Sequence, residues 1–147
     1  MARARRVLVV DDDVEAREGL CESLRAWGYE VDAAENGCDT LEKLDDEPDI
    51  VVADLRLPDS DACDVIRLVR GYAGESVYLI AFSGWHHHRM TALAAGADAF
   101  ILKSDIDALE HALAAYKVAE VPTPTKSASD DIGTEGRRII VSTARQQ

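Results

Sequence analysis

Four short apolar segments of the chain are each followed directly by a polar side chain that could take part in chemistry. The pairs of segment and side chain are Val7–Val10 with Asp11, Ile50–Ala53 with Asp54, Val77–Phe82 with Ser83, and Ala99–Leu102 with Lys103. Two further aspartates, Asp12 and Asp13, extend the first pair. If the four segments are parallel strands of one sheet, the carboxylates, the hydroxyl and the ammonium group meet in one cleft.

Grouped carboxylates of this kind point to a metal site. Carboxylates repel one another at short range, and Mg²⁺ binds their oxygens while keeping several waters. An acidic Mg²⁺ cleft with an ammonium group and a hydroxyl nearby suits phosphoryl transfer, because the two cations balance charge on the transferring oxygens. We expect Asp54 to be the nucleophile.

The elements that position these residues follow from the hydrophobic pattern. Continuous runs rich in Val and Ile are typical of central parallel strands, and Tyr29–Ala34 alternates as an edge strand does. The first intervening segment has helical spacing, stops at Gly28, and carries Ala16, Leu20, Leu24 and Trp27. Strand followed by helix, five times over, predicts an α/β fold in which helices cover both faces of a parallel sheet.

The last helix and the tail set the domain boundary. The helix follows Asp105, a residue type preferred at N-caps, and its apolar stripe consists of Ile106, Leu109, Leu113 and Tyr116. After Glu120 the sequence turns to Pro, Thr and Ser, which are linker residues. We therefore place one domain at residues 1–120 and a linker or tail without an output domain at 121–147. In that tail, Ile139–Val141 could add a strand to a sheet edge, as in a homodimer that pairs edge strands.

Composition excludes several classes of protein. The net charge of −12 opposes direct binding to nucleic acid or an anionic membrane. This acidity belongs to residues 1–120, which carry −13, whereas the tail carries +1. The apolar stretch after the basic N-terminus is too short for a signal peptide or a membrane span. Three widely spaced cysteines predict reduced thiols that pack in a cytoplasmic protein, namely Cys21, Cys38 and Cys63.

These motifs together resemble the receiver domain of bacterial two-component response regulators. The resemblance covers residues 5 to about 118 and rests on Val7–Asp13, Ile50–Asp59, Leu79–Gly84 and Gly96–Lys103, in the family's order and spacing. It implies a flavodoxin-like, doubly wound (βα)5 fold with a five-stranded parallel sheet in the order 2-1-3-4-5. It also implies a phospho-accepting signalling domain rather than an enzyme, with at most self-phosphorylation and self-dephosphorylation activity.

The resemblance assigns roles to the acidic residues. Asp54 would accept a phosphoryl group from a sensor histidine kinase or a histidine phosphotransfer protein. Asp11, Asp12 and Asp54 would hold Mg²⁺, helped by the backbone carbonyl of Arg56.

The resemblance also assigns roles to the residues that follow. Lys103 would pair with the phosphoryl oxygens, and Ser83 would move inward to hydrogen-bond one of them. Phe100 occupies the aromatic switch position, where the ring turns inward as the hydroxyl leaves. A downstream protein would read the helix and strand from about His86 to Leu102, together with the helix after them.

The sequence departs from the family pattern in four places. Ser104 replaces the usual Pro after Lys103, so the bond is either trans or a strained cis bond. Phe100 lacks the hydroxyl of the commoner Tyr, which favours the inward ring position. Arg56 and Trp85 are bulky residues at positions that the family uses to tune dephosphorylation. We expect them to hinder the attacking water and to lengthen the phosphoryl lifetime.

Simpler structural roles remain open for some residues. Asp13 is expected to cap the following helix rather than to bind metal. Phe100 is explained as well by core packing as by switching. His86, His87 and His88 cannot share one metal ion on a helix, because successive residues point about 100° apart. We expect them to form a polar, partly exposed helix start.

Two other functions compete with a single-domain response regulator. Asp11–Val14 and Leu79–Ser83 also fit the first two motifs of haloacid-dehalogenase-type phosphohydrolases. Such an enzyme needs an acidic pair on a further strand, whereas Asp105 and Asp107 lie on a predicted helix. The second alternative is a phosphorylation-independent, receiver-like adaptor, against which the complete acidic pocket counts.

Overall fold

The computed structural model describes residues 4–55 and 63–120, with side chains as far as residue 116. The chain divides into two compact units between Ser104 and Asp105. The elements are β1 Arg6–Val10, α1 Val14–Ala26, β2 Glu30–Ala34, α2 Gly37–Leu44, β3 Ile50–Asp54, α3 Asp64–Ala73, β4 Tyr78–Ser83, the 3₁₀ turn η1 His86–His88, α4 Arg89–Ala95, β5 Ala99–Leu102 and α5 Ile106–Glu120. None of the helices in the described ranges is long and apolar enough to cross a membrane.

The five strands form one parallel sheet in the order β2-β1-β3-β4-β5. The central strand β3 is buried along its whole length, whereas β2, with its alternating pattern, lies at an edge. The flavodoxin-like fold is confirmed, and each predicted strand is correct to within one residue at either end. Apolar runs predict these strands well because a central parallel strand has no solvent-facing side.

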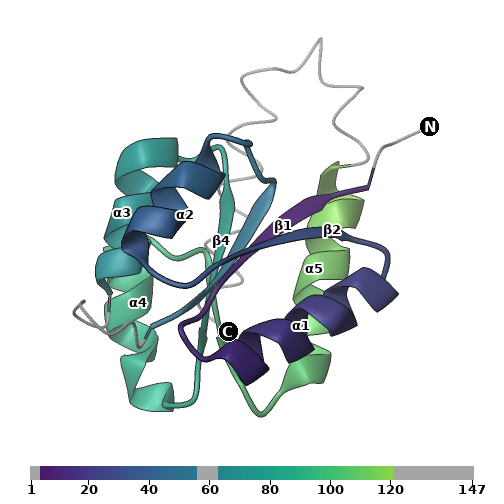
Figure 1. Cartoon of the computed structure of the whole chain (residues 1–147). Coiled ribbons are helices and arrows are strands. Elements are labelled where there is room, and N and C mark those ends of the chain that lie inside the picture. The colour runs from purple at the N-terminus through teal and green to yellow at the C-terminus, as the bar shows by residue number, and fades with distance from the viewer. Residues whose placement is uncertain (1–3, 56–62, 121–147) are drawn as a thin grey trace, which may run out of the picture. The chain divides into compact units, whose positions relative to one another are not determined.

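The first unit packs helices on both faces of this sheet. In Figure 1, α2, α3 and α4 cover one face, and α1 lies on the other. The core beneath α2, α3 and α4 takes alternate residues of the inner strands, namely Leu8, Val10, Val51, Ala53, Leu79 and Ala81. This period of two arises because successive side chains of a strand point to opposite faces. Ile66 and Val69 of α3 fill the space above them.

The predicted helix boundaries are confirmed by their caps. The carboxylate of Asp13 accepts a hydrogen bond from the backbone N–H of Ala16 at 3.2 Å, which satisfies a free donor of α1. Gly28, just after α1, has φ +101°, a conformation that other residues rarely adopt. In the second unit, the Asp105 carboxylate accepts from the N–H of Ala108 at 3.1 Å.

The stripe predicted for α5 is only partly buried. Leu109 and Leu113 are fully buried, as expected. Ile106, at the start of the stripe, is exposed. The first turn of a helix is its most solvated part, and this explains the difference.

The predicted packing role of the cysteines is confirmed for two of the three. Cys21 and Cys63 are buried and form no disulfide, whereas Cys38 is exposed, so the prediction is wrong for Cys38. Burial raises the pKa of the Cys21 thiol above its usual value, and this keeps the side chain neutral.

One arginine joins the chain segments around the amino ends of β4 and β5. The Nε of Arg70, on α3, donates to the Gly96 carbonyl at 2.7 Å. Its Nη1 donates to the carbonyls of Gly74 and Val77 at 2.8 and 2.9 Å. The bonds to Gly96 and Val77 are partly buried, so the guanidinium satisfies carbonyls that burial would otherwise penalise, whereas the bond to Gly74 is exposed.

The same guanidinium is paired with a carboxylate. Arg70 Nη2 donates to Asp98, which also accepts from the N–H of Leu79 at 2.9 Å. Gly96 has φ +127°, and a Cβ atom there would lie 2.7 Å from Cγ of Arg70. The close approach of the two segments therefore requires glycine.

We predict that Arg70→Ala lowers the free energy of unfolding by about 2 to 3 kcal/mol, since it leaves the Asp98 carboxylate without its ion-pair partner and the Gly96 and Val77 carbonyls without the guanidinium donor. Urea denaturation of both proteins measures the change. Arg67→Ala, one turn earlier on α3, is the matched control because its ion pair with Asp64 is solvent-exposed. That control is expected to cost less than about 0.5 kcal/mol, and equal losses for the two variants would contradict the prediction.

Candidate functional site

The register of the sheet brings the ends of four strands to one level. The pairs at this edge are Val10 with Ala53, Asp54 with Phe82, and Ser83 with Leu102. Asp11 and Lys103 each follow directly on a paired strand end. The predicted meeting of these residues at the carboxyl edge therefore follows from backbone pairing alone.

Three carboxylates gather at this edge. One oxygen from each of Asp11, Asp12 and Asp54 lies within 4.8 Å of the other two. Asp11 and Asp54 are only 4% and 3% exposed, whereas Asp12 is open to solvent. Two buried carboxylates this close repel each other more strongly than they would in water, because the protein interior screens charge poorly. The site therefore favours a cation.

Lys103 supplies part of the required positive charge. Its Nζ lies 2.9 Å from Oδ2 of Asp11 and 3.4 Å from Oδ1 of Asp54. Three carboxylates carry more negative charge than this one ammonium group can offset. A divalent ion would balance the excess.

The donor set fits Mg²⁺. All three candidate ligands offer carboxylate oxygens, which hard cations prefer, and the exposed Asp12 leaves room for the waters that Mg²⁺ retains. The fourth predicted ligand, the backbone carbonyl of Arg56, lies outside the described residues.

Neighbouring groups fix the position of Asp11. Its Oδ1 accepts from the N–H of Asp13 at 3.0 Å, and its backbone carbonyl accepts from Nη1 of Arg17 at 2.8 Å. Sequence reasoning did not identify Arg17. The available signal was its place one helical turn after the Asp13 cap, facing back toward the strand end.

Ser83 lies next to this cluster in the sheet and is completely buried. Its carbonyl accepts from the N–H of Lys103 at 2.8 Å. Its Oγ accepts from the N–H of Trp85 at 3.1 Å and lies 3.2 Å from Nδ1 of His88. The hydroxyl is therefore engaged by the β4–α4 segment.

The three histidines differ from one another in burial. His86 and His87 are exposed, which confirms the predicted polar start of the helix region. His88 is half-buried, and its ring reaches back to Ser83. Sequence reasoning missed this contact because it treated the segment as an α-helix, whereas the structure has a 3₁₀ turn at His86–His88.

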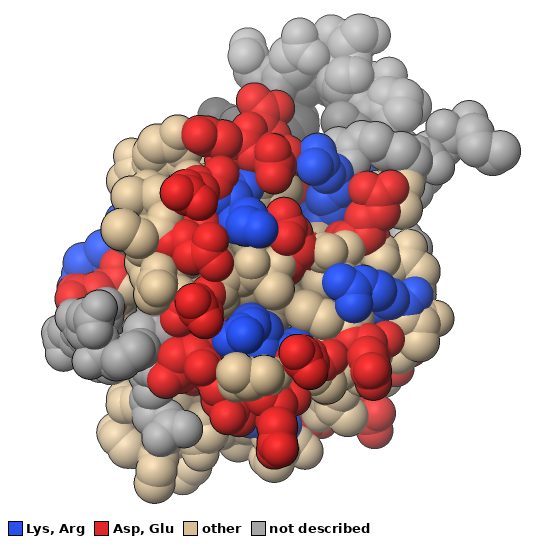
Figure 2. All heavy atoms as spheres, in the orientation of Figure 1, with Lys and Arg blue, Asp and Glu red and all other residues tan. Residues whose placement is uncertain are grey.

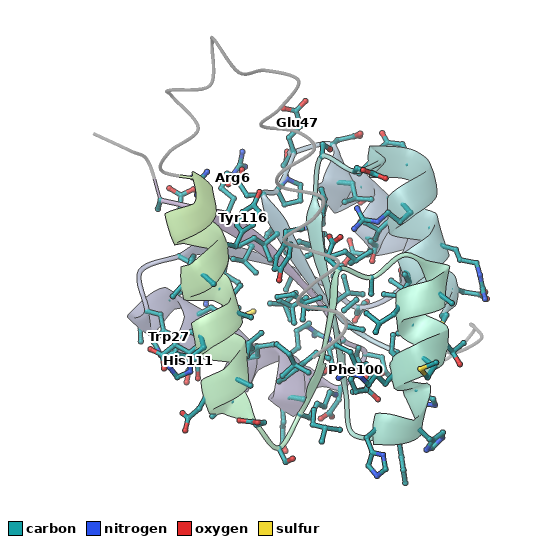
Figure 3. The ribbon with its side chains drawn as sticks, turned by 180° about the vertical axis from the view of Figure 1, so that it is seen from behind. Arg6, Trp27, Glu47, Phe100, His111 and Tyr116 are labelled. Carbon is teal, nitrogen blue, oxygen red and sulfur yellow. The ribbon has the colours of Figure 1, made fainter. Side chains whose placement is uncertain are left out.

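The remaining predicted residues lie around this edge. Phe100, on β5, is half-buried and packs against the core cluster beneath α4 (Figure 3). The bond between Lys103 and Ser104 is trans, the first of the two expected forms. Trp85 is 51% exposed beside the site.

The rest of the acidic charge is dispersed. Figure 2 shows Asp and Glu side chains spread over the visible face with Lys and Arg among them. Pairs such as Lys43 with Asp32, 3.2 Å apart, balance the charge locally. The buried carboxylates of the site thus differ from the surface acids in their surroundings.

Comparison with known proteins identifies related sequences. Residues 7–114 match the family model described as the response regulator receiver domain. Response regulator MprA of Mycobacterium tuberculosis is 34% identical over 130 residues, which are 86% of this chain and 55% of MprA. The probable transcriptional regulatory protein SilR of Salmonella typhimurium is 35% identical over 100 residues, which are 67% of this chain and 44% of SilR. The chain spans about half the length of these curated relatives.

Solved structures agree with this match. The response regulator TrrA of Thermotoga maritima, crystallised with Mg²⁺ and BeF, has a TM-score of 0.68 and 32% identity. The alignment covers 74% of this chain and 96% of TrrA. A CheY-like receiver domain from Methylobacillus flagellatus has a TM-score of 0.69 and 27% identity, and its alignment covers 76% of this chain and 98% of that one.

We predict that Mg²⁺ raises the melting temperature of the protein, because an ion that binds only the folded state stabilises it. At one hundred times its dissociation constant the gain is about 2.7 kcal/mol. Asp54→Asn removes one carboxylate, so it should raise stability in metal-free buffer and reduce the gain from Mg²⁺. Thermal unfolding with increasing MgCl₂ measures both effects.

The control for this experiment is Asp13→Asn. Asp13 is next to the cluster in sequence, but its carboxylate caps α1, and Asn caps helices equally well. This variant should keep the full response to Mg²⁺. If Asp54→Asn responds as strongly as the unaltered protein, the three carboxylates are not the metal site.

Proposed function

This chain belongs to the response regulator receiver domain family of two-component systems, and on that premise we propose that it accepts a phosphoryl group on Asp54. The donor is a sensor histidine kinase or a histidine phosphotransfer protein. The observation that carries the proposal is the position of Asp54 at the carboxyl edge of β3, buried, with Lys103 Nζ at 3.4 Å and the Asp11 and Asp12 oxygens within 4.8 Å.

The residues divide the chemistry among themselves. An oxygen of Asp54 forms a bond to phosphorus while the bond from phosphorus to the donor's histidine nitrogen breaks. Asp11, Asp12, Asp54 and the Arg56 carbonyl would hold Mg²⁺, which would neutralise charge on the phosphoryl oxygens. Lys103 neutralises a further oxygen, and its present contacts with Asp11 and Asp54 keep its ammonium group within reach.

Signalling follows from the change in charge at this edge. Ser83 hydrogen-bonds the new phosphoryl group, and the ring of Phe100 turns inward as the hydroxyl moves. Both residues adjoin α4 and β5, so the rearrangement reaches the surface between His86 and Leu102. A downstream protein reads that surface, and the output is a protein–protein contact.

The proposal also covers the wider role of the chain. Receiver domains are signalling domains, and we assign to this one no catalysis beyond its own phosphorylation and dephosphorylation. We propose that it works in the cytoplasm, which is supported by three cysteines that form no disulfide. We propose that residues 121–147, which lie outside the described residues, form a linker or tail. The strand at Ile139–Val141 and a homodimer through it remain predictions.

The two alternative functions are less well supported. The hydrolase would need a second acidic pair on a strand after Lys103, but Asp105 caps α5 and Asp107 lies in its first turn. A phosphorylation-independent adaptor has no need of buried, mutually repelling carboxylates, which cost stability.

We predict that acetyl phosphate with Mg²⁺ adds one phosphoryl group to the protein, detected by intact-protein mass spectrometry. Asp54→Ala should abolish the gain, and omission of Mg²⁺ should reduce it strongly. Asp13→Asn is the control, because it changes a neighbouring aspartate whose carboxylate caps α1 and lies outside the proposed metal site. This variant should be phosphorylated normally. A mass gain that persists in Asp54→Ala, or none in the unaltered protein, would overturn the proposal.

A further prediction concerns the phosphoryl lifetime. Replacing Arg56 and Trp85 together by alanine should shorten the half-life of the phosphorylated protein several-fold, because the two bulky side chains hinder the attacking water. The decay is followed by mass spectrometry after the phosphodonor is removed. Tyr72→Ala, an exposed aromatic on α3, is the control for loss of a surface ring. An unchanged half-life in the double variant would contradict the expected hindrance.

A further inference from the structure

The hydroxyl of Ser83 is held by groups that lie outside the phosphorylation site. Among the described residues, its contacts are with Trp85 and His88: the Trp85 N–H at 3.1 Å, the Trp85 carbonyl at 3.5 Å and Nδ1 of His88 at 3.2 Å. Ser83 is fully buried, so water does not compete for these contacts. The hydroxyl therefore takes its partners from the β4–α4 segment.

A serine hydroxyl has only one proton to donate. The Trp85 N–H donates to Oγ and occupies one of its lone pairs. The proton is left with two acceptors, of which Nδ1 of His88 is the nearer and the Trp85 carbonyl lies at the limit of a hydrogen bond. With the imidazole proton on Nε2, Nδ1 is an acceptor, and the geometry then favours donation from Ser83 to the imidazole.

The ring of His88 is itself held in place. His88 ends the 3₁₀ turn and precedes α4, so its backbone is fixed by the start of that helix. Its ring meets the His87 ring edge-on with centroids 4.5 Å apart, and the His87 ring lies 5.9 Å from that of Trp85. A half-buried side chain in such a row of rings has few alternative rotamers.

We propose that His88 is a positioning residue that withholds the Ser83 hydroxyl from phosphorylated Asp54. This inference rests on the proposed function, in which Ser83 donates its proton to a phosphoryl oxygen. The imidazole and the phosphoryl group compete for the same proton. His88 thus opposes the activated arrangement and sets how much of the protein adopts it after phosphorylation.

The test is the binding of beryllofluoride with Mg²⁺, which stands in for the phosphoryl group on Asp54, measured by titration calorimetry on the full chain. His88→Ala removes the competing acceptor and should tighten binding about two- to tenfold, the range for one hydrogen bond between neutral groups. His88→Asn keeps an acceptor at the position of Nδ1, so it should bind as the unaltered protein does. His86→Ala, an exposed histidine of the same turn, is the matched control.

A double-mutant cycle separates this role from a merely structural one. If His88 acts through the Ser83 hydroxyl, His88→Ala should have no effect on binding in a Ser83→Ala background. An unchanged affinity in His88→Ala, or the same change with and without Ser83, would overturn the inference and leave the proposed function standing. If beryllofluoride does not bind to the unaltered protein in a way that depends on Asp54, both the inference and the proposed function are overturned.

Discussion

The repulsion between buried carboxylates at the carboxyl edge of the sheet is the constraint on which the rest of the molecule depends. Asp11 and Asp54 are almost completely removed from water, and burial makes their mutual repulsion costly. The sheet holds them there because backbone pairing between β1 and β3, rather than side-chain attraction, sets their level. Lys103 reduces the cost only in part. The site is thus prepared for a divalent cation and for a group that brings further oxygens to it.

At the amino ends of β4 and β5, polar groups attract one another instead of repelling. There Arg70 satisfies carbonyls from several connections and pairs with Asp98, so polar groups at that end are matched with one another. The repulsion between carboxylates at one end of the domain lowers its stability. Because the net stability of small domains is only about 5 to 15 kcal/mol, favourable interactions elsewhere must offset this cost. The apolar core beneath α2, α3 and α4 and the Arg70 network provide these interactions.

The proposed function and the inference about His88 describe one competition. In the proposed function, the phosphoryl group attracts both Lys103 and the Ser83 hydroxyl. In the unmodified site Lys103 contacts the carboxylates of Asp11 and Asp54, and the Ser83 hydroxyl contacts Trp85 and His88. The proposed phosphorylation would require each of these contacts to be exchanged. The free energy of the response is therefore a difference between two sets of hydrogen bonds and ion pairs, and side chains that touch only the unmodified set can set its size.

The sequence by itself determined the strands, the order of strand and helix, and the place of the candidate site residues at the strand ends. Apolar runs and the polar residues that follow them are local patterns, and parallel pairing aligns the strand ends. Asp13 as a cap was also predictable, since capping acts over three residues. Only the tertiary structure decided the contacts of Arg70 with Gly96 and Asp98, which are 26 and 28 residues away. It also decided the approach of His88 to Ser83, which depends on a 3₁₀ turn in place of an α-helix. Such contacts depend on how separate segments pack, and no local pattern records that.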